Sequence, residues 1–202
     1  MIKYILFQYL NGVNKMINKT VEFDLQIDRA NIWLRKSAVF SESDDIQIFA
    51  KFYFLWSAFN SLYNLAYDEN IDEKSRIKSL LNLLSEADAE SIINIDNCNY
   101  LMNIEEPVKN EGHHMLMIYN GLYRENPRNR NYDEKKYNRI YASKNADLKS
   151  KLNAVFLTIY QIRNNLTHGN KSGDLRDKLL VKSAIPIIKN TIKLLLKHLK
   201  ES

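Results

Sequence analysis

The chain has 202 residues, of which 45% are hydrophobic and 11% aromatic, and its formal net charge at pH 7 is +5. This apolar content can form a sizeable core and excludes a chain that is disordered throughout. Five Gly and three Pro are too few for the tight turns of a β-sandwich or barrel, and a single Cys excludes a disulfide framework and a Cys-rich zinc site. We therefore expect one domain over residues 1–202 and a reducing compartment, the cytoplasm.

The net charge is compatible with a polyanionic partner such as nucleic acid, but it does not identify one. No apolar run in the sequence reaches the roughly 18 residues that a membrane span needs, so we expect no membrane contact. Residues 1–7 are largely apolar, but Gln8 and Asn11 interrupt the run and no small-residue cleavage site follows. We therefore do not expect a signal peptide.

The first half of the chain predicts a series of helices. Apolar residues between Phe49 and Tyr63 recur every three or four positions, which is typical of a helix with one broad buried face. We place this helix near 44–67. Shorter helices are expected at about 25–40, 73–84 and 86–93.

The periodicity fades between residues 94 and 146, which we interpret as an irregular insertion between the core helices. Short helices are expected within it at 113–122 and 133–143. A basic stretch in the insertion, with interleaved tyrosines, can contact an RNA backbone and stack on bases, or it can form a solvated loop. Both alternatives remain open for its arginines, Arg124, Arg128 and Arg130.

Helical periodicity returns at Asp147 and predicts one helix at 147–168 and another at 174–199. Pro186 lies inside the last helix, so we expect a kink there, or a break at which Ser183 caps a second segment. The fold class is therefore all-α.

The most informative stretch ends the 147–168 helix, where Arg163, Asn164 and His168 follow an apolar run. His can act as an acid or a base near neutral pH, and Arg can hold a phosphate with two donors. Asn164 and His168 are four residues apart and share a helix face. The alternative is structural, because Arg and His near a helix C-terminus also complement the helix dipole.

The string Arg163-Asn164-Asn165-Leu166-Thr167-His168 resembles the R-N-x-x-x-H form of the motif of the HEPN superfamily (higher eukaryotes and prokaryotes nucleotide-binding domain). The segment from Phe54 to Tyr63 resembles a helix with the pattern lW-x-AFN-x-LY, found in several prokaryotic HEPN groups. The resemblance covers roughly residues 45–68 and 148–198. It implies a helical bundle of four or five core helices that usually forms a homodimer.

The resemblance also implies a metal-independent endoribonuclease of the toxin–antitoxin or antiviral-defence type. Its partners would be RNA, a second copy of the chain and a cognate antitoxin or defence protein, with no cofactor. An RNA 2′-hydroxyl would attack the adjacent phosphorus, His168 would move the proton and Arg163 would stabilise the phosphorane. Asn164 would orient a phosphate oxygen or the partner's His168.

Two further residues are candidates for contact with RNA: Lys171, which follows the motif, and Asn60, which is on the helix near 44–67. A buried Asn60 satisfied by the backbone is the alternative. A second function class also remains open. The chain could be a non-catalytic HEPN-like module that binds RNA, nucleotide or a protein partner.

Overall fold

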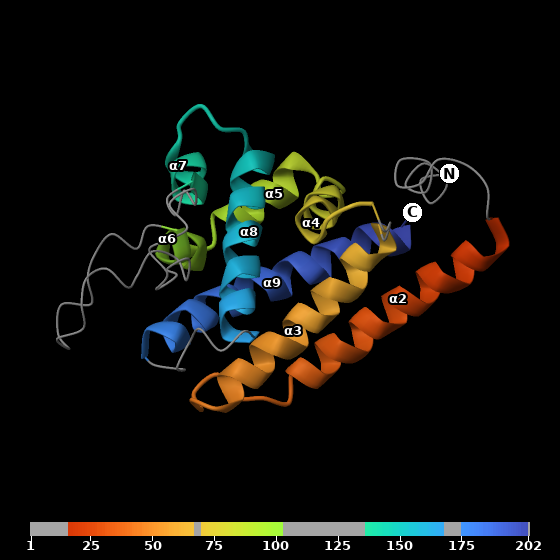
Figure 1. Ribbon diagram of the computed structural model, residues 1–202, viewed down its shortest axis with the longest axis horizontal. Helices are drawn as coiled ribbons and strands as arrows, with labels where there is room; N and C mark the ends of the chain where they lie inside the picture. Colours follow the sequence, from red (N-terminus) through yellow and green to blue (C-terminus); the bar gives the residue numbers. More distant parts are fainter. Residues whose placement is uncertain (1–15, 67–69, 103–135, 168–174, 202) are drawn as a thin grey trace. The chain divides into compact units, whose positions relative to one another are not determined.

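The computed structural model describes residues 16–66, 70–102, 136–167 and 175–201, and within these ranges every regular element is a helix (Figure 1). The all-α fold class is therefore confirmed. The elements are α2 (Met16–Ser37), α3 (Gln47–Tyr63), the 3-10 helix η1 (Asn64–Ala66), α4 (Glu73–Leu81), α5 (Glu86–Ile93), α6 (Asp96–Met102), α7 (Lys136–Ala142), α8 (Leu148–Thr167) and α9 (Leu175–Glu201).

The chain forms two compact units. Unit 1 comprises Met1–Asp88 and Ile188–Ser202, and unit 2 comprises Ala89–Ile187. The boundaries between the units fall within α5 and α9. The expectation of a single domain stays a prediction.

The core of unit 1 is built on α3, which lies side by side with α2 (Figure 1). Phe52, Phe59 and Tyr63 of α3 are fully buried. The Phe59 ring contacts the rings of Trp56 and Tyr63 at centroid distances of 5.5 and 5.6 Å. The Trp33 ring of α2 meets the Phe54 ring of α3 at 5.4 Å. Aromatic side chains therefore hold α2 against α3.

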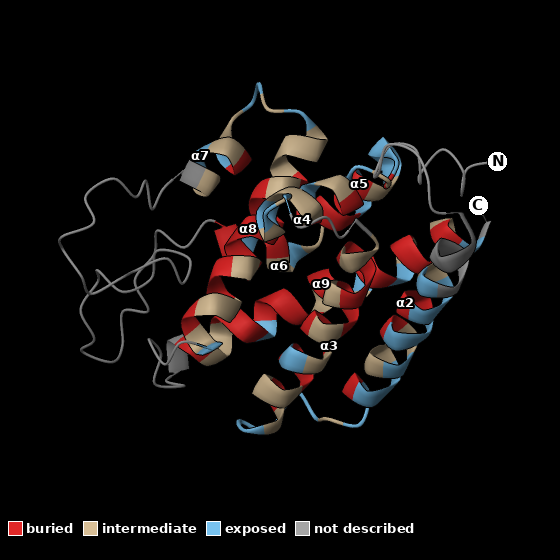
Figure 2. Ribbon diagram, turned by 45° about the vertical axis from the view of Figure 1, so that its right-hand side comes forward, coloured by how far each residue is buried: buried red, intermediate tan, exposed pale blue. Residues whose placement is uncertain are grey.

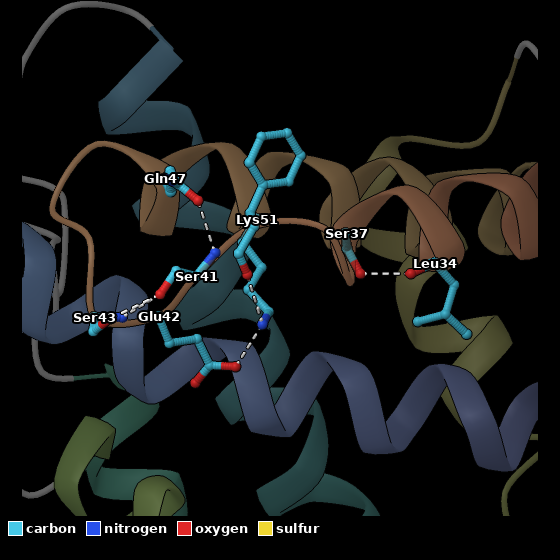
Figure 3. A network of polar contacts seen from close by, with 8 residues as sticks. Leu34, Ser37, Ser41, Glu42, Ser43, Gln47 and Lys51 are labelled. Atoms are coloured by element: carbon cyan, nitrogen blue, oxygen red, sulfur yellow. Dashed lines mark hydrogen bonds and ion pairs between the residues drawn. The ribbon is translucent and has the colours of Figure 1, made fainter.

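The turn between α2 and α3 is held by a buried lysine (Figure 3). The Lys51 ammonium lies 2.8 Å from Oε1 of Glu42 and donates to the carbonyl oxygen of Phe40 at 3.1 Å. The amide oxygen of Gln47 accepts from the backbone N–H of Ser41 at 3.0 Å. Because a buried ammonium is costly without partners, Lys51 restricts the turn to a conformation that supplies them.

The bounds of the first two helices differ from the prediction. α2 begins at Met16, well before residue 25, because its buried face includes Gln26 and Ala30 and so gives a weak apolar pattern. α3 begins at Gln47, because the Asp44 carboxylate accepts the backbone N–H groups of Ile46 and Gln47 at 2.9 and 2.8 Å and forms a turn first. These hydrogen bonds lower the pKa of Asp44.

The expectation of an irregular segment from residue 94 was wrong at its start, because Asp96–Met102 forms α6. The helix buries Cys98, Leu101 and Met102 within unit 2. α7 lies within the short helix predicted at 133–143 and bonds to α6, since Nδ2 of Asn138 donates to the carbonyl oxygen of Met102 at 2.5 Å. The helix predicted at 113–122 lies outside the described residues.

Of the two alternatives predicted at Pro186, a kink or a break, the break was wrong, since α9 is one helix from Leu175 to Glu201. The Ser183 hydroxyl donates to the carbonyl oxygen of Leu179 at 2.9 Å, so it bonds within the helix and does not cap a new one. Proline inside a helix costs about 3 kcal/mol, and burying one isoleucine side chain contributes about 1.5–3 kcal/mol. Ile185 and Ile187, on either side of Pro186, are both buried, so packing offsets the missing backbone hydrogen bond.

The start of α5 is closed by a reciprocal cap. The Ser85 hydroxyl oxygen accepts the backbone N–H of Asp88 at 3.1 Å, and the Asp88 carboxylate accepts the backbone N–H of Ser85 at 3.0 Å. Nε2 of His198, near the end of α9, lies 2.7 Å from the same carboxylate. The Ser85 hydroxyl, followed by His198, lowers the pKa of Asp88, while burial opposes the shift.

We expect Ser85→Ala to lower the free energy of unfolding by about 0.5–2 kcal/mol at neutral pH, because the variant has no cap. Because the pKa of the Asp88 carboxyl is lower in the folded protein than in the unfolded chain, its ionised form stabilises the fold at pH values above the unfolded pKa. This contribution disappears as the pH falls through the folded pKa. The difference between wild type and variant should therefore narrow as pH falls below about 4, the ordinary pKa of an Asp carboxyl. The free energies of unfolding are measured by urea titration at several pH values, with circular dichroism as the signal.

Ser79→Ala on α4 is the matched control, and we expect it to leave the free energy of unfolding nearly unchanged. A destabilisation by Ser85→Ala that is equal at neutral and acidic pH would contradict the role of the Asp88 carboxylate.

Candidate functional site

The C-terminal half of α8 carries the candidate site. The helix forms because apolar residues such as Leu152, Val155 and Ile159 recur every three or four positions, and all three are buried in unit 2. Its last two turns are more polar. They hold the polar residues Gln161, Arg163, Asn164, Asn165 and Thr167, and the helix ends at Thr167.

Arg163 and Asn164 are in direct contact. Nη1 of Arg163 donates to Oδ1 of Asn164 at 2.8 Å, and both side chains are half-buried. The guanidinium also lies over the ring of Tyr160, 5.5 Å from its centroid. A neutral amide and an aromatic face hold a guanidinium in place without cancelling its charge. The structure therefore adds a role for Asn164, which is to orient Arg163.

An aromatic residue of α7 extends this cluster. Burial raises the pKa of Tyr137, and the nearby Tyr160 raises it further. α7 packs against α8, so the two tyrosines belong to adjoining helices of unit 2. Tyr137 is therefore a neutral phenol at physiological pH and offers an apolar ring next to the one that carries Arg163.

Sequence reasoning missed a buried polar pair next to Arg163. Nε2 of Gln161 donates to Oδ1 of Asn165 at 2.8 Å, and the two residues are 7% and 2% exposed. Nδ2 of Asn165 has no hydrogen-bond partner among the described residues. A buried donor left unpaired costs about 1–3 kcal/mol, so this amide is an energetic liability at the end of α8. The signal in the sequence was its spacing, because Thr158, Gln161 and Asn165 recur every three or four positions as buried residues do.

A row of lysines follows one face of the second half of α9, within unit 1. We call it the α9 lysine surface. Its members lie within about 80° of one another around the helix axis. None makes an ion pair or hydrogen bond with another described residue, and no acidic residue separates them in sequence. They are Lys189, Lys193, Lys197 and Lys200, the first half-buried and the other three exposed.

The lysine surface has the spacing of a site for a polyanion. Like charges four residues apart on a helix are destabilising by about 0.2–0.5 kcal/mol per pair, and a chain of phosphates would relieve that repulsion.

The other candidate residues have different outcomes. Asn60 is half-buried on α3 in unit 1, and its backbone carbonyl accepts the N–H of Asn64. The remaining candidates lie outside the described residues: His168, Lys171, Arg124, Arg128 and Arg130.

The described residues limit the kind of site in three further ways. No group of three or more His, Cys, Asp or Glu residues in these ranges is arranged to hold a metal ion. No helix among the described residues is long and apolar enough to cross a membrane. The single cysteine, Cys98, is buried, and burial raises the pKa of its thiol to about 12, which makes it a poor nucleophile.

Comparisons of the chain with protein-family models, with curated proteins and with solved structures found no match.

Proposed function

We propose that this protein is a HEPN-like endoribonuclease that cleaves RNA without a metal ion, in a site shared by two copies of the chain. The observation that carries the proposal is the contact between Arg163 and Asn164 at the end of α8, five and four residues before His168 in sequence. Two other side chains of α8, Asn164 and Tyr160, orient the guanidinium at this end of the helix, and a phosphate clamp requires an oriented guanidinium.

The reaction follows from the chemistry of these side chains. The RNA 2′-hydroxyl attacks the adjacent phosphorus while one His168 accepts its proton, and Arg163 stabilises the charge of the phosphorane. The bond from phosphorus to the 5′ oxygen then breaks, and that oxygen takes a proton from the second His168. The products are a 2′,3′-cyclic phosphate and a 5′-hydroxyl. Separate acid and base groups account for the use of two copies.

The neighbours of Arg163 suit a single-stranded substrate. Bases that are not paired can stack on aromatic side chains, and each stacked base contributes about 1–3 kcal/mol. Tyr160 offers a half-buried ring beside the guanidinium, and the half-buried Tyr137 lies near Tyr160. The α9 lysine surface adds an electrostatic contribution that does not depend on RNA sequence.

The second candidate function is a HEPN-like module that holds RNA, nucleotide or a protein partner without cleaving it. The α9 lysine surface favours this alternative, because four lysines bind a polyanion but perform no acid–base chemistry there. In either case we place the protein in the cytoplasm, in a toxin–antitoxin or antiviral-defence system with a cognate partner, as the resemblance implies.

We expect His168→Ala to lower the rate of RNA cleavage by about 10²–10⁴-fold, because general acid–base catalysis contributes that much. Arg163→Ala should be comparably damaging, and Arg163→Lys should recover only part of the rate, since lysine keeps the charge but lacks the planar two-donor geometry. The measurement is cleavage of a mixed RNA pool, with the 2′,3′-cyclic phosphate ends identified by mass spectrometry.

Arg29→Ala, at an exposed position of α2 in unit 1, is the arginine control and should keep the wild-type cleavage rate. Cleavage should also persist in EDTA. Activity that disappears in EDTA or survives His168→Ala would refute the mechanism, and RNA binding without cleavage in the wild type would select the binding module.

We expect replacement of Lys189, Lys193, Lys197 and Lys200 by Gln to weaken binding of a fluorescent single-stranded RNA and to flatten its salt dependence. Each RNA phosphate that the variant no longer neutralises should reduce the slope of log affinity against log salt by about 0.7. Fluorescence anisotropy over a series of salt concentrations measures both quantities.

A control variant removes the same four charges elsewhere, by Gln at Lys74, Lys78, Lys144 and Lys151. Equal weakening by the two variants would show that net charge alone attracts RNA, and would exclude the lysine surface as its site.

A further inference from the structure

The face of α2 that points away from α3 carries exposed apolar side chains. Leu25 and Ile32 are each 41% exposed and are seven residues apart, so they lie on the same face of the helix. The opposite face, which includes Ile27 and Ala30, is buried, and Figure 2 shows the division between the two faces along α2. Unit 1 therefore leaves an apolar strip on α2 uncovered by the described residues.

Charges of opposite sign occupy the two ends of this strip. From residue 22 to residue 36, where the burial of the side chains is described, the exposed acidic residues all precede the exposed basic residues. The helix dipole favours such an order only within the first and last turns, whereas Asp28 and Arg29 lie more than two turns from either end. The acidic residues are Glu22, Asp24 and Asp28, and the basic residues are Arg29, Arg35 and Lys36.

We propose that α2 pairs in antiparallel orientation with α2 of a second copy of this chain, about a two-fold axis near residue 29. In this register Leu25 lies opposite the partner's Ile32, and Asp24 lies opposite the partner's Arg35. Glu22 likewise faces the partner's Lys36. A parallel pair would set acid against acid and base against base, so the charge order selects the antiparallel arrangement.

The occupant is a second copy because the strip is complementary to itself. A two-fold contact uses the same patch on both partners, so each pair of residues must occur twice. In each of the three pairs, the position halfway between the two residues lies close to residue 29. A two-fold contact requires this common midpoint, whereas a contact with an unrelated partner does not. The strip from Glu22 to Lys36 spans about 21 Å. Because this contact is small, we expect a dissociation constant in the micromolar range.

This pairing does not rest on the proposed ribonuclease activity. It is a contact through unit 1, whereas the shared catalytic site brings together residues at the end of α8 in unit 2. The charge reversals on α2 change this contact and leave the residues at the end of α8 unchanged, so they distinguish the pairing from association through the catalytic site.

The test is sedimentation velocity of the full-length protein from about 5 to 100 μM, the range around a micromolar dissociation constant. Asp24 and Arg35 are chosen because neither side chain bonds to another described residue. In a two-fold pair Asp24→Lys or Arg35→Glu places like charges together at two sites at once. We expect each single variant to raise the dissociation constant about tenfold or more, and the double variant D24K/R35E to return it near the wild-type value.

Two further variants separate packing from charge. Leu25→Ser should weaken association as well, whereas Ile46→Ser, which changes an 83% exposed side chain outside α2, should not. Circular dichroism establishes that each variant is folded. The proposal is overturned if the wild type remains at the 23.8 kDa of a single chain throughout, if the single reversals leave association unchanged, or if the double variant fails to recover it.

Discussion

Burial of α3 is the constraint on which unit 1 depends. Ten of the seventeen residues of this helix are buried, including the full rings of Phe52 and Phe59, so neighbouring helices must cover it almost on all sides. α2 supplies one cover, and the ammonium of Lys51 then requires the α2–α3 turn to offer Glu42 and a backbone carbonyl. The orientation of α2 that results is what leaves Leu25 and its neighbours on the outside.

α8 both packs into the core of unit 2 and carries the polar side chains of the candidate site. Its apolar stripe anchors it in unit 2, so the polar side chains of its last two turns are carried on packed secondary structure and not on a loop. Arg163 is held from two directions, by the amide of Asn164 and by the ring of Tyr160. Beside it, the buried amides of Gln161 and Asn165 bring polar groups into a position where an apolar residue would pack at no cost.

The α9 lysine surface and the outer strip of α2, both in unit 1, differ in the signs of their charges. This difference determines which kind of partner each surface suits. The α9 lysine surface has a single sign and gains only from a partner that is uniformly negative. The outer strip of α2 has both signs, ordered along the helix, and adds an apolar pair at its centre. It therefore suits a partner helix that has the same order of charges and runs in the opposite direction. A second copy of α2 meets this requirement.

The sequence by itself determined the all-α class and the helices that became α3, α8 and α9, because helical periodicity is a local property of the chain. Only the tertiary structure decided that α9 continues through Pro186, that residues Asp96–Met102 are helical and that Asn165 is buried. In each case the free energy of packing against other helices outweighs a local preference of about 1–3 kcal/mol. That packing energy depends on residues distant in sequence, so the local preference of each segment does not predict these outcomes.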